Sequence, residues 1–377
     1  MIPKSERIHV SQALHGYHDG HQLLATSEKL DSAAKMKLLQ MSDSPGSGFN
    51  DSNTPCLTGY PLPEAGKYAL AKTWPALQME RPGCVWTHTI LIDFSDLPRI
   101  SDLSLLLSYL RKPEALTFDG YKKSLTLSNK NTVSTKGSHD DLGLEELIYR
   151  LYSTNTTVEL AKELVCDETV FKVWSQQWPR LRRSFSFRTW NNKTSSKSRA
   201  TFDVILSVDN ISLHNSASFK NQNYHWILDA TLDARNKAGG ELREFLWKHG
   251  GNTAQTREAY IPLLRAWKLS NGDENDLSEL SNFLLKWPSR PSSIVRAIAN
   301  KISHSNYPCL DENTTNLLIG DIDSIKASDL SRSGEELIGR SLGTNQSDLL
   351  HKVTSPWTEH SDGILKGAAE TMYYKSI

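Results

Sequence analysis

The stretch "LHGYHDGHQLLA", residues 14–25, places three histidines around one Asp-Gly pair between two apolar runs. The residues before and after this pair have the alternating or apolar patterns of β-strands. Asp-Gly between two such runs is a strong hairpin signal, because both central residues of the tight turn need a positive φ. We therefore predict a β-hairpin over residues 7–28. A two-residue loop would set His18 opposite His21 and point His15 to the other face.

A second strand pair is predicted over residues 67–94, where "KYALAKTWPAL" and "CVWTHTILIDF" flank a short connection. This pair adds His88, which shares a strand face with Trp86. If both hairpins belong to one sheet, His88 approaches His15 or His21. Two close imidazoles can share a proton, bind a metal or polarise a phosphate. The competing interpretation is that His88 is a hydrogen-bonded core residue and the other histidines are structural.

The rest of the chain predicts an α+β fold in two parts. Residues 97–178 have mainly helical patterns, and residues 182–208 return to strand patterns. Beyond residue 235 nearly every segment is a helix candidate, and the connections are short. We therefore predict an α+β domain over residues 1–210, with mixed strands and helices, and a mainly helical domain over residues 235–377.

Composition bounds the function only loosely. Lys+Arg and Asp+Glu both number 43, so the net charge predicts no partner. The four cysteines are far apart without a Cys-x-x-Cys pair, which argues against a zinc ribbon and favours reduced thiols in a cytoplasm. No run of 18 apolar residues and no signal-peptide core is present, so we expect no membrane association. No carboxylate stands at the spacing of a metal triad, and we expect neither metal nor cofactor.

A basic segment, residues 172–199, stands out in this neutral chain. Its centre, "WPRLRRSFSFRTW", alternates aromatic residues with serines, which predicts a strand that buries Phe185 and Phe187 on one face. The arginines that could contact phosphate or an acidic partner are Arg180, Arg182, Arg183 and Arg188. Arginines interleaved with aromatics also suit nucleotide or nucleic-acid binding. Strict alternation would separate Arg183 from the other three, however, and no Walker A loop indicates an NTPase.

The hairpin, together with "GCVWTHTILI" at residues 83–92, resembles the N-terminal domain of a bacterial family called GTPase-associated protein one, first N-terminal type. The matching residues are His15, Gly16, Tyr17, Gly20, His21, Trp86, His88, Thr89, Trp178, Pro179, Leu181, Arg182, Phe185, Ser186 and Phe187. The resemblance covers about residues 5–210. It implies a component of a multi-gene bacterial conflict system, encoded beside a GTPase or other NTPase and acting as its regulatory or adaptor subunit. No established catalytic activity comes with it.

We therefore expect a cytoplasmic, non-catalytic adaptor of an antiviral defence module. Its expected binding surface comprises His15, Gly16, Tyr17, Gly20, His21, Trp86, His88 and Thr89. The first alternative is a hydrolase, a phosphoesterase or nuclease, with His15, His21 and His88 as candidate catalytic residues. The second is a nucleic-acid-binding module that uses the basic segment.

Overall fold

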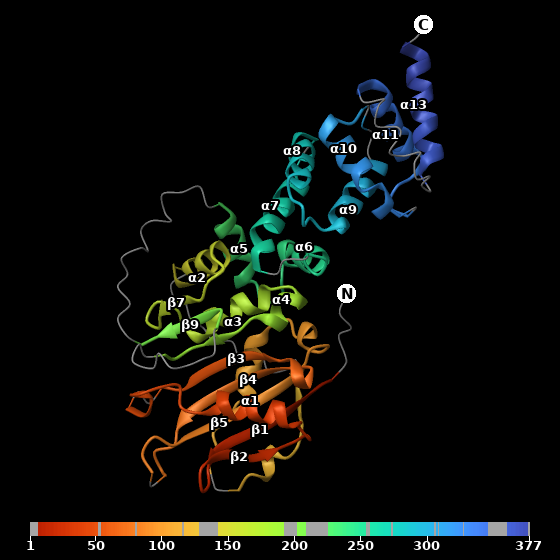
Figure 1. Ribbon diagram of the computed structural model, residues 1–377. Coiled ribbons are helices and arrows are strands. Elements are labelled where there is room, and N and C mark those ends of the chain that lie inside the picture. Colours follow the sequence, from red (N-terminus) through yellow and green to blue (C-terminus); the bar gives the residue numbers. More distant parts are fainter. Residues whose placement is uncertain are drawn as a thin grey trace. The chain divides into compact units, whose positions relative to one another are not determined.

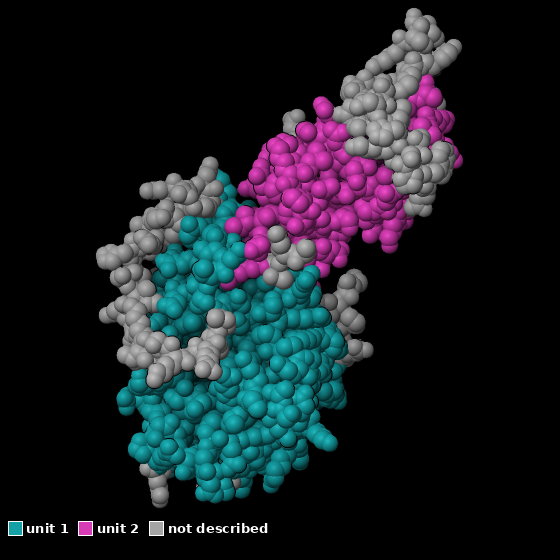
Figure 2. Space-filling view, in the orientation of Figure 1, with its two compact units in different colours: residues 1–244 teal, residues 245–377 magenta. Residues whose placement is uncertain are grey.

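The structure, a computed structural model, has an α+β fold in two compact units, residues 1–244 and 245–377 (Figure 2). It describes residues 7–51, 54–79, 81–114, 117–127, 142–191, 202–208, 225–253, 257–272, 274–304, 307, 309–326, 328–345 and 360–375. The boundary between the units lies inside helix α6 (Glu241–Gly250). Helix α5 (His225–Arg235), nearly all of which falls between the two predicted domains, packs against helices of the first unit.

The first unit is built on one mixed sheet (Figure 1). Within the described residues its strands are β1 (Ile8–Tyr17), β2 (His21–Thr26), β3 (Cys56–Leu62), β4 (Lys67–Pro75), β5 (Val85–Asp93), β6 (Leu125–Leu127), β7 (Val158–Ala161), β8 (Phe187–Arg188) and β9 (Val204–Ser207). The order is β2-β1-β5-β4-β3-β8-β9-β7, and β6 pairs with the start of β1. Both predicted hairpins are present, and β1 pairs directly with β5.

The first hairpin has a different register from the predicted one. Tyr17 lies opposite His21, so the loop holds three residues, His18, Asp19 and Gly20. Asp19 has a φ of 55° and Gly20 a φ of 137°, which places the two positive-φ residues at the second and third loop positions. The predicted pairing of His18 with His21 is therefore wrong by one position. Because side chains alternate, this single step moves His21 to the other face of the ribbon.

Helix α1 (Ser32–Ser42) covers one side of the sheet, which we call the α1 face. Its N-cap is Asp31, whose carboxylate accepts a hydrogen bond of 2.7 Å from the Ala34 amide. The buried residues of the helix contact the strands, whereas the apolar side chain of Met36, on its other side, is 71% exposed. Ala34, Leu38 and Met41 pack against buried side chains of β3, β4 and β5. His15 points toward this side of the sheet.

The other side, which we call the opposite face, is covered by α3 (Asp167–Gln176) and by residues that follow β5. The Tyr68 ring lies 4.6 Å from that of Trp174, and the Phe187 ring lies 5.7 Å from the same tryptophan. The Tyr68 hydroxyl donates a hydrogen bond of 2.8 Å to the Phe185 carbonyl oxygen. Aromatic burial of this kind makes a large contribution to stability, so the "FSF" string belongs to the core.

Two predicted elements are wrong. Residues 158–161, predicted to be helical, form strand β7 parallel to β9, because Val158 and Leu160 alternate with exposed Glu159. Residues 179–184, where the predicted strands began, form a short helix, α4 (Pro179–Ser184). Proline suits the first position of a helix, since its missing N–H needs no partner there. The predicted helical insert also contains 3₁₀-helices and strand β6 besides α2 (Leu142–Ser153) and α3.

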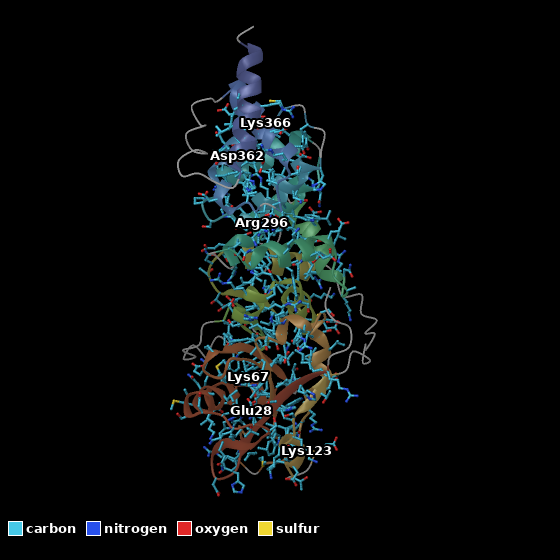
Figure 3. All side chains as sticks on the ribbon, turned by 90° about the vertical axis from the view of Figure 1, so that its right-hand side faces the viewer. Glu28, Lys67, Lys123, Arg296, Asp362 and Lys366 are labelled. Carbon is cyan, nitrogen blue, oxygen red and sulfur yellow. The ribbon has the colours of Figure 1, made fainter. Side chains whose placement is uncertain are left out.

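The second unit is helical, as predicted. Its helices after α6 are α7 (Tyr260–Ser270), α8 (Glu274–Leu285), α9 (Ser292–Ser303), α10 (Glu312–Gly320), α11 (Arg332–Asn345) and α13 (Ser361–Lys375). Neighbouring helices pack on one another, and α11 lies along α13, where Lys366 pairs with Glu336 at 2.9 Å. Figure 3 labels Lys366 on α13 and Arg296 on α9. Within the described residues, no helix is both long and apolar enough to cross a membrane.

Candidate functional site

His15 and His21 meet on the α1 face, near the turn of the first hairpin. Their rings are stacked, with centroids 6.3 Å apart. His15 is 1% exposed, whereas His21 is half-buried and its Nε2 lies 2.8 Å from the hydroxyl of Ser42, the last residue of α1. The two imidazoles share a face because the three-residue loop placed His21 opposite Tyr17. Two of the predicted histidines are thus brought together, although not the predicted pair.

His88 lies on the opposite face and does not join them. It pairs with Leu14 across β1 and β5, whereas His15 pairs with Thr87. Its Nε2 is 2.9 Å from the Gln12 side-chain oxygen, and its Nδ1 accepts a hydrogen bond of 3.1 Å from the Arg111 amide. The bonds of both ring nitrogens show that His88 is a hydrogen-bonded core histidine. The three-histidine catalytic site of the hydrolase hypothesis is not assembled.

Burial keeps the inner histidines neutral. Desolvation, and then the neighbouring His21, lower the pKa of His15 from 6.5 to about 3. Desolvation, and then Arg111, lower the pKa of His88 to about 3. The pKa of His21 is also lowered by burial, although the nearby Asp43 carboxylate opposes this. Neutral imidazoles do not attract phosphate by charge, and both side chains are buried.

The contact between His21 and Ser42 does not make a nucleophile. The Ser42 hydroxyl has one proton, and the Leu39 carbonyl oxygen, 2.9 Å away, can only accept it. Ser42 Oγ then accepts a hydrogen bond from His21 Nε2, which fixes the His21 tautomer with its proton on Nε2. In addition, Ser42 is 1% exposed, so its hydroxyl is out of reach of a substrate. The pair anchors the end of α1 to the hairpin.

A row of hydroxyls continues this polar contact into the sheet. The Thr87 hydroxyl lies 2.6 Å from the Ser42 carbonyl oxygen and 2.9 Å from the Thr73 hydroxyl. All three residues are buried. Hydrogen bonds in this row satisfy polar groups that would otherwise be costly to bury, so they fix α1 on the sheet.

Gly16 and Trp86 fit together on the opposite face. A Cβ atom on Gly16 would lie 2.3 Å from Cζ3 of Trp86, which is 1% exposed. We expect Gly16→Ala to lower the free energy of unfolding by about 1–3 kcal/mol, the usual cost of overpacking a core. Chemical denaturation measures this loss. Adding Trp86→Leu should make the Gly16 substitution less costly than in the parent, and purely additive losses in the double mutant would contradict the contact.

Of the predicted binding surface, only the hairpin end is accessible. His15, Gly16, Trp86, His88 and Thr89 are buried, whereas Tyr17, Gly20 and His21 are half-buried. The first five residues therefore support the surface and do not form it. Exposed Arg81, from the loop between β4 and β5, lies with its guanidinium carbon 5.6 Å from the centre of the Tyr17 ring. We call Tyr17, Gly20, His21 and Arg81 the hairpin-end surface.

The four arginines of the basic segment do not share an exposed face. Arg182 is fully buried: its Nη1 donates 2.7 Å to the Ile100 carbonyl oxygen, and its Nη2 donates to that of Ser175. Arg188 is 8% exposed on the α1 face, 4.9 Å from the Phe202 ring centre. Arg180 is exposed and Arg183 half-buried. The predicted strand is wrong at residues 182–184, where α4 takes its place and buries Arg182. Residues 192–199 of the segment lie outside the described residues.

Sequence reasoning missed the partners that hold the histidines. Gln12 had one visible signal, since it is the polar interruption in an otherwise apolar row of β1. Ser42 and Arg111 had none, because helix ends and loop amides carry no pattern that links them to a distant histidine. Within the described ranges, no three histidine, cysteine or acidic side chains gather closely enough to hold a metal ion.

The chain is an α+β protein in which buried hydrogen bonds hold the histidines of the sheet in place. Only the end of the first hairpin is accessible at this site. Residues 9–110 match the family model described as GTPase-associated protein 1, N-terminal domain type 1. This range includes β1 from His9 onward, β2 to β5, α1 and the loop that carries Arg81, and so every residue of the hairpin-end surface. Neither the curated proteins nor the solved structures contain a match to the chain.

Proposed function

We propose that this chain is a cytoplasmic regulatory or adaptor subunit of an NTPase-linked bacterial defence system, and that the hairpin-end surface docks its GTPase partner. The match of residues 9–110 to a GTPase-associated domain carries the proposal. The geometry supports a binding role over a catalytic one, because Ser42 is inaccessible and His15 and His88 point to different faces.

The hairpin-end surface has the chemistry of a small protein contact. Tyr17 and Arg81 are both among the residue types enriched in binding hot spots. His21 adds a directed acceptor, since its Nε2–H is bonded to Ser42 and its Nδ1 keeps a lone pair. The polar row beneath holds these groups in place before binding, which lowers the entropic cost of association.

The test is capture of the GTPase encoded beside this chain by the tagged full-length protein, with GTP, with GDP and without nucleotide. We expect Tyr17→Ala and His21→Ala to reduce capture at least tenfold, about 1.4 kcal/mol or more of binding free energy. His21→Ala removes one hydrogen bond, so its stability should fall by only about 1 kcal/mol. Denaturation curves check that both variants remain folded.

His18→Ala is the matched control, because the His18 side chain is 73% exposed in the same turn and lies outside the hairpin-end surface. It should bind like the parent chain. Equal capture by all three variants, or capture that does not depend on the presence of the tagged chain, would overturn the proposal.

A further inference from the structure

We propose that a small cavity in the first unit, next to α3 and lined by Lys172, Ser175 and Arg243, binds a phosphate group. The cavity has a volume of about 30 Å³. A water needs roughly 10–15 Å³ of such space, so the cavity holds about two waters, and phosphate oxygens would take their places. It lies between the outer side of α3, the residues before a 3₁₀-helix at Leu103–Tyr109, and the turn that joins α5 to α6.

Three hydrogen-bond donors of the residues that line this cavity have no acceptor among the described residues. Arg243 is 7% exposed, and its Nη1 is buried without a hydrogen-bond partner. The Ser175 oxygen accepts from the Leu103 amide at 3.0 Å, which leaves its hydroxyl proton available. No hydrogen bond or ion pair joins Lys172 to another described residue. A buried donor without an acceptor is costly, and a bound oxyanion would satisfy all three donors at once.

A buried positive charge next to the cavity, that of Arg182, also favours an anion, although the cations that line the cavity are largely offset. Arg243 is offset by Asp233, with its Nε 3.5 Å from a carboxylate oxygen, and Lys237 by Asp102 at 3.7 Å. Arg182 donates hydrogen bonds to backbone carbonyl oxygens, including that of the cavity residue Ser175. Burial, and then Arg243, lower the pKa of Arg182, which reflects the cost of placing its charge there. A bound anion would reduce this cost.

Acidic neighbours select among oxyanions. Glu168, one turn before Lys172 on α3, also lines the cavity, as does Asp102. Hydrogen phosphate carries an O–H group that can donate to a carboxylate, whereas sulfate at neutral pH has acceptors only. A carboxylate among the donors therefore favours phosphate over sulfate. The phosphate could be free or the terminal group of a nucleotide, and the two sources are distinguished by titration.

The experiment is calorimetric titration of the full-length chain with sodium phosphate, ATP, sodium sulfate and sodium chloride at matched ionic strength. We expect saturable binding of phosphate and much weaker binding of sulfate. Binding of inorganic phosphate assigns the site to free phosphate, and binding of ATP alone assigns it to a nucleotide's terminal phosphate. The absence of binding by both, equal binding of sulfate, or an effect that chloride reproduces would overturn the proposal.

Variants locate the site. Lys172→Ala should weaken phosphate binding about tenfold, as expected for the loss of one charge-assisted hydrogen bond. Glu168→Gln should narrow the preference for phosphate over sulfate, since an amide can donate to either ion. Lys122→Ala is the control, because Lys122 is 60% exposed and pairs with Asp119 far along the chain from α3. Binding that Lys172→Ala leaves unchanged would place the phosphate elsewhere and overturn the assignment. These readouts need no partner GTPase, so their failure is distinct from failure of the proposed adaptor role.

Discussion

Replacing Arg182 by leucine is expected to destabilise the first unit by about 2–4 kcal/mol, because the loss of its hydrogen bonds outweighs the relief of a buried charge. Its guanidinium donates to the carbonyl oxygens of Leu97 and Ile100, at 3.4 and 2.7 Å, and to that of Ser175. Leucine fills part of the volume but leaves these buried carbonyls without their donors. Each lost partner costs about 1–3 kcal/mol.

Urea unfolding followed by tryptophan fluorescence measures this loss. Trp174 is a suitable probe, since its Nε1 donates to the Arg182 carbonyl oxygen at 3.1 Å and it lies in the aromatic core. Arg180→Leu is the matched control, because Arg180 is exposed on the same short helix. Surface substitutions usually change stability by about 0.5 kcal/mol or less. If the two variants unfold at the same urea concentration, the buried hydrogen bonds of the Arg182 guanidinium do not stabilise the first unit.

The prediction of the hairpins from sequence succeeded because strand patterns and Asp-Gly are local signals. The register failed because a three-residue loop with Asp19 and Gly20 at positive φ uses the same dipeptide as a two-residue loop. A shift of one residue then reversed the face of His21, and with it the predicted partner. Patterns of hydrophobicity fix which residues are buried more firmly than they fix which residues meet.

The basic segment shows that the sequence pattern predicted which aromatic residues are buried but not the helix α4 or the burial of Arg182. Phe185 and Phe187 are buried, as their alternation with serine predicted, although the strand that carries Phe187 is only Phe187–Arg188. The preceding Trp178-Pro179 pair begins a helix six residues long, too short for a periodic signal. The burial of Arg182 depends on carbonyl groups some 80 residues earlier in the chain, at Ile100 and Leu97. Tertiary partners of this kind are invisible to local pattern analysis.

Acidification below about pH 6.5 is expected to destabilise the first unit well before its carboxylates titrate. His15 and His88 have folded-state pKa values of about 3, against 6.5 in an unfolded chain. Between these two pH values the histidines are protonated in the unfolded chain but not in the folded chain. The free energy of unfolding is therefore highest above pH 6.5 and falls as the pH drops toward 3. At pH 5, about 1.5 pH units below 6.5, each histidine lowers the free energy of unfolding by about 2 kcal/mol, because each pH unit costs about 1.36 kcal/mol.

Together the two histidines lower the free energy of unfolding by about 4 kcal/mol at pH 5. This is a large part of the roughly 5–15 kcal/mol that is typical of the free energy of unfolding of a folded domain. Denaturation midpoints at pH 7, 6 and 5 measure the slope, and this window lies above the range in which ordinary carboxylates titrate. His88→Gln removes one of the histidines whose pKa is lowered by burial, so its stability should depend on pH less steeply than that of the parent chain. Stability that is flat from pH 7 to pH 5 would show that His15 and His88 are charged or solvated in the folded chain, and the packing of both faces of the sheet would then have to differ from that described.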